Sequence, residues 1–91
     1  MILPPETIKN KLKELNGWSY ENNSIHKEYV LADFSSVLAF TVKVGIESEK
    51  MDHHPDIFIH SWNKCKIIIS THSQGGVTEK DISLAHAIEK V

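Results

Sequence analysis

Apolar residues follow first a helical spacing and then an extended spacing near the start of the chain. Proline is tolerated in a first helical turn, so Pro4-Pro5 predicts the start of a short helix that ends before Asn16-Gly17. Extended runs at residues 18–20 and 25–31, separated by turn residues 21–24, predict a hairpin. The apolar face of the helix consists of Ile8, Leu12 and Leu15.

A second helical spacing follows Asp33, whose carboxylate is suited to capping a helix. Gly45 weakens this pattern without ending it. Because Pro55 disfavours helical geometry at His54, the helix must end near Met51, and the residues after it form a loop. The helical period is carried by Phe34, Val37, Leu38, Thr41 and Val44.

The last third of the chain predicts a second hairpin and a third helix. Residues 57–62 and 65–70 are short and rich in isoleucine, and Asn63-Lys64 between them is a plausible tight turn. A capping box then opens a helix that extends to about Lys90. The capping residues are Thr78 and Asp81, and the apolar stripe of the helix is Ile82, Ala85 and Ile88.

The order of these elements is helix, hairpin, helix, hairpin, helix. Parallel strands would need longer crossovers than the short turns within each hairpin allow, so the strands pair antiparallel. The pattern therefore predicts an α+β fold, in which a four-stranded antiparallel sheet has three helices packed on one face. Residues 1–91 are expected to form one domain.

Composition narrows the class of protein. The hydrophobic fraction of 41% and the charged fraction of 24% are typical of a globular domain, and no apolar run is long enough to cross a bilayer. No charged leader with an apolar core marks the first residues for secretion, so we expect a cytoplasmic protein. Cys65 is the one cysteine, and its apolar surroundings favour a buried thiol over a reactive one.

Charge and size bear on binding partners. The net charge is −2 and every basic residue is a lysine spread along the chain, so the sequence offers neither a basic stripe nor the guanidinium groups that read guanine. Direct nucleic-acid binding is therefore not expected.

The size of the chain bears on self-association. A chain of 91 residues buries a modest fraction of its surface, and an interface between copies would add to its stability. We therefore expect self-association.

Three of the six histidines are predicted to converge. His53 and His54 precede one strand of the second hairpin, and His72 follows the other. The start of one antiparallel strand lies beside the end of the next, so His72 should return to the His53-His54-Pro55 loop. Glu49, one helical turn before His53, could orient an imidazole or could be a solvated charge on the helix.

The residues alone leave three interpretations of this cluster open. Imidazole, with an unperturbed pKa of about 6.5, suits acid-base chemistry such as dehydration. A metal site is the second interpretation, although there is no cysteine cluster and no helical His-x-x-x-His pair. A structural or interaction role is the third. Phe58 and Trp62 could stack on a flat ligand or belong to the core.

The spacing of several residues resembles the signature of the pterin-4a-carbinolamine dehydratases. The resemblance extends over nearly the whole chain, and the predicted order of elements agrees with it. One departure lies at residues 57–61, where the animal-like pattern has a tryptophan close behind the proline and one residue fewer. The matching residues are Glu49, His53-His54-Pro55, Trp62, Ser70-Thr71-His72, Gly76 and Asp81-Ile82.

The resemblance implies a reaction and a site. The reaction is removal of water from a 4a-hydroxytetrahydropterin to give quinonoid dihydropterin, with no metal and no organic cofactor. The resemblance also implies a homodimer or a homotetramer. His53 and His72 would be the principal acid-base pair, and His54 would hold the pterin and assist. Some members of the family also bind a transcription factor, so an interaction module on the same fold is the alternative. Substrate-binding roles are implied for Glu49, Asp52, Ser70, Thr71 and Trp62.

Overall fold

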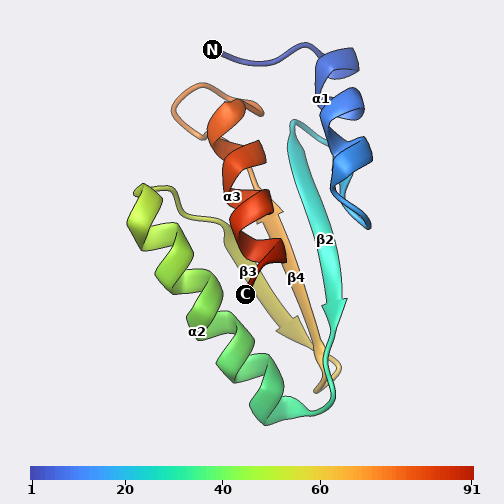
Figure 1. Ribbon diagram of the computed structural model, residues 1–91, viewed down its shortest axis with the longest axis vertical. Coiled ribbons are helices and arrows are strands. Elements are labelled where there is room, and N and C mark those ends of the chain that lie inside the picture. Colours follow the sequence, from blue (N-terminus) through green and yellow to red (C-terminus); the bar gives the residue numbers. More distant parts are fainter.

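The computed structural model describes residues 1–91, and its elements follow the predicted order (Figure 1). Three helices and a short 3-10 turn alternate with two hairpins. No helix combines the length and the apolar character needed to span a membrane. The elements are α1 (Pro5–Lys11), η1 (Leu12–Glu14), β1 (Ser19–Glu21), β2 (Ser24–Val30), α2 (Phe34–Met51), β3 (Asp56–His60), β4 (Lys64–Ile69) and α3 (Glu79–Glu89).

The four strands form one antiparallel sheet in the order β1-β2-β4-β3. Ile69 of β4 lies opposite Ile25 of β2, and Ile68 lies opposite Asp56 of β3. The two hairpins therefore join through β2 and β4, which leaves β1 and β3 at the edges. Helices α2 and α3 cover one face of this sheet (Figure 1). The predicted α+β fold with antiparallel pairing is confirmed.

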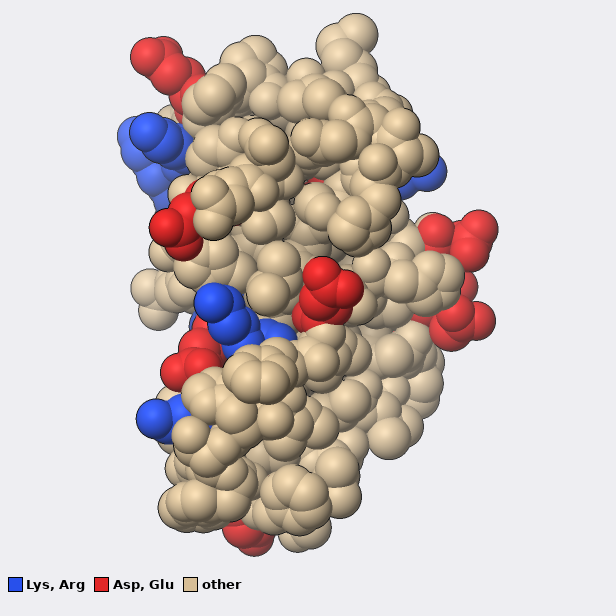
Figure 2. Space-filling view, turned by 180° about the vertical axis from the view of Figure 1, so that it is seen from behind, with Lys and Arg blue, Asp and Glu red and all other residues tan.

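A single hydrophobic core lies between the helices and the sheet. Because successive side chains of a strand point to opposite faces, alternate residues of β4 are buried and the others face outward. Figure 2 shows the molecule from behind, where acidic and basic side chains are scattered over the surface without one sign dominating. The core includes Ile8 of α1, Val37 and Val44 of α2, Ile25, Cys65, Ile67 and Ile69 of the sheet, and Leu84, Ala85 and Ile88 of α3.

The turn of the second hairpin differs from the prediction. It comprises residues 61–63, so β3 ends two residues earlier than expected and β4 begins and ends one residue earlier. Ser61 and Trp62 adopt left-handed conformations, with φ of +50° and +55°. Such conformations cost roughly 1 to 2 kcal/mol per residue outside glycine. Trp62 is 64% exposed and Phe58 is 58% exposed, so of the two interpretations of these aromatics, a position in the core is wrong.

Helix α2 carries more apolar residues than the core receives. Val37 and Val44 are buried, but four apolar residues at spacings of four lie on another side of the helix and are about half exposed. The helical period of α2 is therefore confirmed, whereas only part of its apolar surface faces the sheet. We call the exposed set the α2 stripe: Phe34, Leu38, Val42 and Ile46.

The N-terminal segment is fastened to the loop that precedes α3. The backbone N–H of Leu3 donates a hydrogen bond of 2.8 Å to the carbonyl oxygen of Val77. The side chain of Ile2 lies so close to Gly76 that a Cβ there would meet it at 3.2 Å. Residues 2 and 3 thus support the loop that follows β4.

The other end of α3 is held by Glu89. Its carboxylate accepts hydrogen bonds from Trp18 Nε1 at 3.2 Å, from Lys27 Nζ at 2.8 Å and from the Tyr29 hydroxyl. Partial burial alone would raise the pKa of Glu89, but these hydrogen bonds outweigh burial and hold the pKa below its usual value. Glu89 therefore ties the C-terminal turn of α3 to the β1–β2 side of the sheet.

Candidate active site

The site begins where α2 ends. Asp52 takes a left-handed conformation with φ of +50°, and its N–H donates a hydrogen bond to the carbonyl of Glu49. The His53 N–H then donates to Ser48, so the chain reverses over one turn. This reversal ends the helix near Met51, as predicted from Pro55, and sends two consecutive histidines to opposite environments.

His53 turns inward and meets Asp81 of α3. Its Nε2 lies 2.6 Å from Asp81 Oδ1, and the histidine is 9% exposed. Asp81 is fully buried, with an exposure of 0%. Its second oxygen, Oδ2, accepts hydrogen bonds from Thr71 Oγ1 at 2.8 Å and from the Thr78 N–H at 2.7 Å. Thr78 Oγ1 also lies 2.8 Å from Thr71 Oγ1.

These contacts make Asp81 a link between the helix cap and the site. The capping box of Thr78 and Asp81 is confirmed, and the same carboxylate receives the imidazole of His53. A buried carboxylate requires hydrogen-bond donors, and three groups supply them here. Because an ionised carboxylate only accepts, the proton of this contact belongs on His53 Nε2, which leaves Nδ1 free to accept.

His54 turns outward and meets Glu49. Its Nε2 lies 2.7 Å from Glu49 Oε1, but both side chains are largely exposed. Water competes for such a contact and salt screens it, so the pair constrains His54 only weakly. The site therefore has a buried inner histidine and a solvated outer one.

A small hollow opens beside these histidines and collects most of the residues singled out from the sequence. His72 lies on its rim in the turn after β4, so hairpin geometry brings it back to His53 and His54 as expected. Thr71 lines the hollow, although its hydroxyl is directed to Asp81. All the lining residues are polar: Asp52, His53, His54, Ser70, Thr71, His72, Ser73 and Lys80.

Two of the predicted substrate-binding residues, Trp62 and Glu49, do not line this hollow, and Trp62 lies far from it. Trp62 occupies the β3–β4 turn, whereas the histidines lie at the opposite end of that hairpin. Glu49 does not line the hollow either, but it reaches the site through His54. The substrate-binding role of Trp62 therefore stays a prediction, although Trp62 lies away from the histidines in this chain.

Two lining residues and one role were missed from the sequence. Ser73 and Lys80 border the hollow, and no pattern in the sequence distinguishes them from other surface residues. Asp81 was interpreted as a capping residue first, and its second oxygen is what joins it to His53. The sequence did offer one signal for this role. Asp81 falls on the apolar face of its helix, where a charged residue is unusual and needs a partner.

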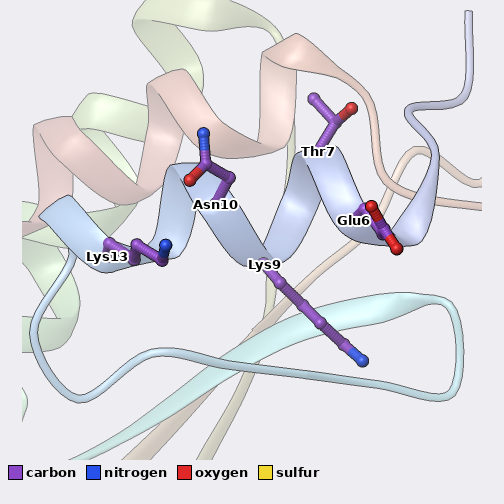
Figure 3. Close-up of a pocket in the computed structure, with 5 residues that line it drawn as sticks. All are labelled: Glu6, Thr7, Lys9, Asn10 and Lys13. Carbon is purple, nitrogen blue, oxygen red and sulfur yellow. The ribbon is translucent and has the colours of Figure 1, made fainter.

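A larger hollow runs along the outer side of α1, but its side chains point in different directions (Figure 3). Thr7 is half-buried, and the other four lining residues are exposed. It contains no histidine and only one carboxylate, so convergent chemistry favours the histidine hollow as the active site. The lining residues are Glu6, Thr7, Lys9, Asn10 and Lys13.

The next question is whether the side chains that commonly bind metals lie close together. No three or more of the chain's His, Cys, Asp and Glu side chains gather in a way that could hold an ion. Cys65 is buried, as predicted, and burial raises the pKa of its thiol, with partial compensation from Thr41. We assign it no role in the site.

Comparison with known proteins identifies relatives over the full length of the chain. Residues 1–91 match the model of the family described as pterin 4 alpha carbinolamine dehydratase. A protein of Sulfolobus acidocaldarius with the provisional name pterin-4-alpha-carbinolamine dehydratase is 43% identical over 91 residues, which cover 100% of this chain and 99% of the relative. A protein of Prochlorococcus marinus with the same provisional name is 45% identical over 90 residues, covering 99% and 94%.

Solved structures share the fold. A crystal structure described as a transcriptional coactivator/pterin dehydratase from Brucella melitensis matches with a TM-score of 0.92 and 30% identity, covering 99% of this chain and 97% of that one. A pterin dehydratase-like protein, described as a RuBisCO assembly factor in the alpha-carboxysome, matches with a TM-score of 0.64 and 15% identity, covering 80% and 83%. At 15% identity, the second match shows a shared fold and carries no conclusion about function.

Proposed function

The chain belongs to the pterin-4a-carbinolamine dehydratase family, and on this premise we propose that it removes water from a 4a-hydroxytetrahydropterin to give a quinonoid dihydropterin. The observation that carries the proposal is the polar hollow in which His53, His54 and His72 meet. Only this hollow combines several imidazoles with a buried carboxylate beside them. A cytoplasmic location remains a prediction of the sequence.

The reaction requires two proton movements. The 4a-hydroxyl is a poor leaving group and must gain a proton to depart as water. A ring nitrogen must lose a proton so that its electron pair forms the new double bond. Two imidazoles in different protonation states can serve as acid and base near neutral pH.

We assign the base to His53. Its Nε2 proton is held by Asp81, so Nδ1 is the nitrogen available to accept a proton from the ring. Asp81 fixes the tautomer and then stabilises the imidazolium that forms, in the manner of carboxylate-oriented histidines in other enzymes. His72, on the rim of the hollow, is assigned as the acid that protonates the 4a-hydroxyl.

The remaining lining residues would hold the substrate. His54, supported by Glu49, would bind the pterin from the outer side and assist. Asp52, Ser70 and Ser73 offer acceptors and hydroxyl groups to the polar edge of the ring, and Lys80 adds a positive charge. Orientation of a flat ring between these groups would supply part of the rate enhancement.

Turnover of a chemically generated 4a-hydroxytetrahydropterin tests this function. We expect the wild-type chain to accelerate the loss of the compound, and the His53→Ala, His72→Ala double variant to lose most of that acceleration. A matched control is the His26→Ala, His86→Ala double variant, because neither histidine lines the hollow. Equal rates for the wild-type chain and the His53/His72 variant would remove the proposal.

A second candidate function is a protein-interaction module on the same fold, with weak dehydratase activity or none. Two observations favour it. The α2 stripe exposes four apolar side chains in one row, a pattern associated with docking of another helix. The Brucella relative is described both as a transcriptional coactivator and as a pterin dehydratase. The same surface could serve self-association into a dimer or tetramer.

The two candidates differ in what depends on the α2 stripe. A Leu38→Glu, Val42→Glu variant should keep turnover if the chain is an enzyme, because these residues do not line the hollow. If the chain is an interaction module, the variant should lose a partner that the wild-type chain retains in a pull-down. Robust turnover together with no retained partner would count against the module.

A further inference from the structure

We propose that the chain carries a second catalytic site, which hydrolyses small carboxylic esters at the turn of the β3–β4 hairpin. Its three side chains are Ser61, His60 and Glu28, and we call them the turn triad. The turn triad lies at the end of the hairpin opposite the histidine hollow (Figure 1) and shares no residue with it. The proposal is therefore independent of the dehydratase activity.

His60 has a hydrogen-bond partner at each ring nitrogen. Its Nε2 lies 2.5 Å from Glu28 Oε1, and its Nδ1 lies 3.0 Å from Ser61 Oγ. Because an ionised carboxylate only accepts, the ring proton belongs on Nε2, and Nδ1 accepts from the serine hydroxyl. A nucleophile, a base and an orienting carboxylate thus stand in the order that acyl transfer by a serine requires.

The sheet holds the imidazole of His60 in place. Phe58 stacks on it, with ring centroids 5.0 Å apart and ring planes inclined by 15°. Glu28 belongs to β2 and His60 to β3, so their contact reaches across β4. The side chains of His60 and Glu28 are 29% and 40% exposed. The base is therefore partly shielded from water, and a substrate can still reach it.

Ser61 has the backbone of a strained nucleophile. It directly follows the last residue of β3 and has φ of +50°. Apart from Trp62, the other non-glycine residues in this conformation are two asparagines and an aspartate, which tolerate it better than serine does. In hydrolases with a nucleophile elbow, a sharp turn after a strand likewise exposes the serine hydroxyl. Strain of this kind collects at functional sites.

Donors for the negative charge of an acyl-transfer intermediate lie in the same turn. No backbone carbonyl of the chain accepts a hydrogen bond from the N–H groups of Ser61 and Trp62. The N–H of a nucleophile and that of the next residue are donors of the kind that form oxyanion holes. Lys64 lies opposite His60 in the register of the sheet, so a positive charge is carried on the same face.

The surroundings of Ser61 indicate esters with a small aromatic group. Trp62 follows Ser61 in the turn and is 64% exposed, so its indole offers contact area to a flat group. A phenol is a better leaving group than an amine and depends less on protonation. A partly exposed base therefore suits aryl esters better than amides.

The reaction passes through an acyl-serine. Ser61 Oγ attacks the carbonyl carbon as its proton passes to His60 Nδ1, and an electron pair moves onto the carbonyl oxygen. When that pair returns, the bond to the aryloxy group breaks, and this group takes the proton from His60 and leaves as a phenol. Water then attacks the acyl carbon, again through His60, which releases the carboxylic acid and returns the proton to Ser61.

Hydrolysis of p-nitrophenyl acetate tests the activity. Ser61→Gly removes the hydroxyl and keeps a residue suited to φ of +50°, so the turn is retained. We expect kcat/KM to fall at least about tenfold in Ser61→Gly and in His60→Gln. Glu28→Gln should lose about three- to tenfold, because its contact is partly exposed.

The matched control is Ser35→Ala, which should hydrolyse the ester as the wild-type chain does. Ser35 is exposed, and its hydroxyl donates to Asp33 with no imidazole beside it. The comparison with Ser61→Gly also subtracts hydrolysis by exposed imidazoles acting without a serine. Equal kcat/KM for the wild-type chain and Ser61→Gly would overturn the proposal.

Covalent labelling identifies the nucleophile without an assay of turnover. A fluorophosphonate probe should attach to Ser61, located by mass spectrometry of peptides, and the label should decrease at least about tenfold in His60→Gln. The His53→Ala, His72→Ala double variant should keep both the label and the ester hydrolysis, because the histidine hollow is a separate site. Absence of label from Ser61, or loss of ester hydrolysis in the double variant, would overturn the turn triad.

Discussion

His53 and His54 are adjacent in sequence and differ in almost every physical respect. His53 is buried and its partner Asp81 is fully buried, and both carboxylate oxygens of Asp81 accept hydrogen bonds from groups of the fold. His54 and its partner Glu49 are both largely exposed, although their contact is almost as short. The difference shows that a distance alone does not measure an interaction, because burial and the further partners of the carboxylate decide its strength.

The largest effect is expected from Asp81→Asn, which breaks the inner side of the site. The amide cannot accept from His53, Thr71 and Thr78 together, so His53 loses its orientation and its defined tautomer. We expect kcat to fall by about 10²- to 10⁴-fold, and the free energy of unfolding to fall by roughly 1 to 3 kcal/mol. Steady-state kinetics and thermal denaturation measure the two effects.

The matched control is Glu79→Gln, which removes a carboxylate from the same first turn of α3. Glu79 is exposed and pairs with Lys11 at 3.1 Å, away from His53. The Glu79→Gln variant should turn over substrate at the same rate as the wild-type chain. Should Asp81→Asn keep kcat within about twofold of the wild-type value, the inner side would have no special role.

A smaller effect is expected from Thr71→Val, which keeps the shape of the side chain and removes the hydroxyl. Asp81 Oδ2 then loses one of its two donors. We expect a loss of about 1 to 2 kcal/mol in the free energy of unfolding, with a decrease in turnover of about tenfold. Thr71→Ser retains the hydroxyl and should behave almost as the wild type, and an equal loss in both variants would contradict the role of the hydrogen bond.

Glu49→Gln tests the outer side and should change much less. We expect a change in the free energy of unfolding within about 0.5 kcal/mol and a decrease in turnover of about threefold or less. Any difference from the wild-type chain should shrink as salt is raised, because both groups are solvated. A decrease in turnover as large as that of Asp81→Asn would show that the Glu49–His54 pair matters as much as the Asp81–His53 pair.

The smallest effect on turnover is expected from Glu89→Gln, at the far end of the helix that carries Asp81. The wild-type pKa of Glu89 is lowered in the fold, so its stabilisation is present at neutral pH and is lost as pH falls through the folded-state pKa. The variant should lose roughly 1 to 2 kcal/mol at pH 7 and much less in acid, with kcat unchanged. Urea denaturation at several pH values measures this, and an equal loss at every pH would contradict it.

The order of elements was predictable because each one has a local cause. Pro55 ends α2, the capping box opens α3, and the isoleucine-rich runs form a hairpin. The convergence of His72 with His53 and His54 follows from antiparallel pairing alone. Those parts of the site depend on spacing along the chain, which the sequence displays directly.

The remaining parts depend on packing between elements, which the sequence displays poorly. The turn at residues 61–63 was misplaced because Asn63 is a better turn residue than Trp62, and Trp62 nevertheless takes the left-handed conformation. That displacement moved Trp62 from the end of a strand into the turn, and in both positions Trp62 lies at the end of the hairpin opposite the histidines. The role of Asp81 was obscured because its helix cap already accounted for the residue.

The hydrogen bond from Leu3 to Val77 has a practical consequence for handling the protein. Residues 2 and 3 contact the loop that connects His72 to the cap of α3, so a bulky fusion at the N-terminus would displace that loop. Val91 is partly open to solvent and lies beyond the last turn of α3. Purification tags and surface attachments therefore belong at the C-terminal end, where they leave the histidines undisturbed.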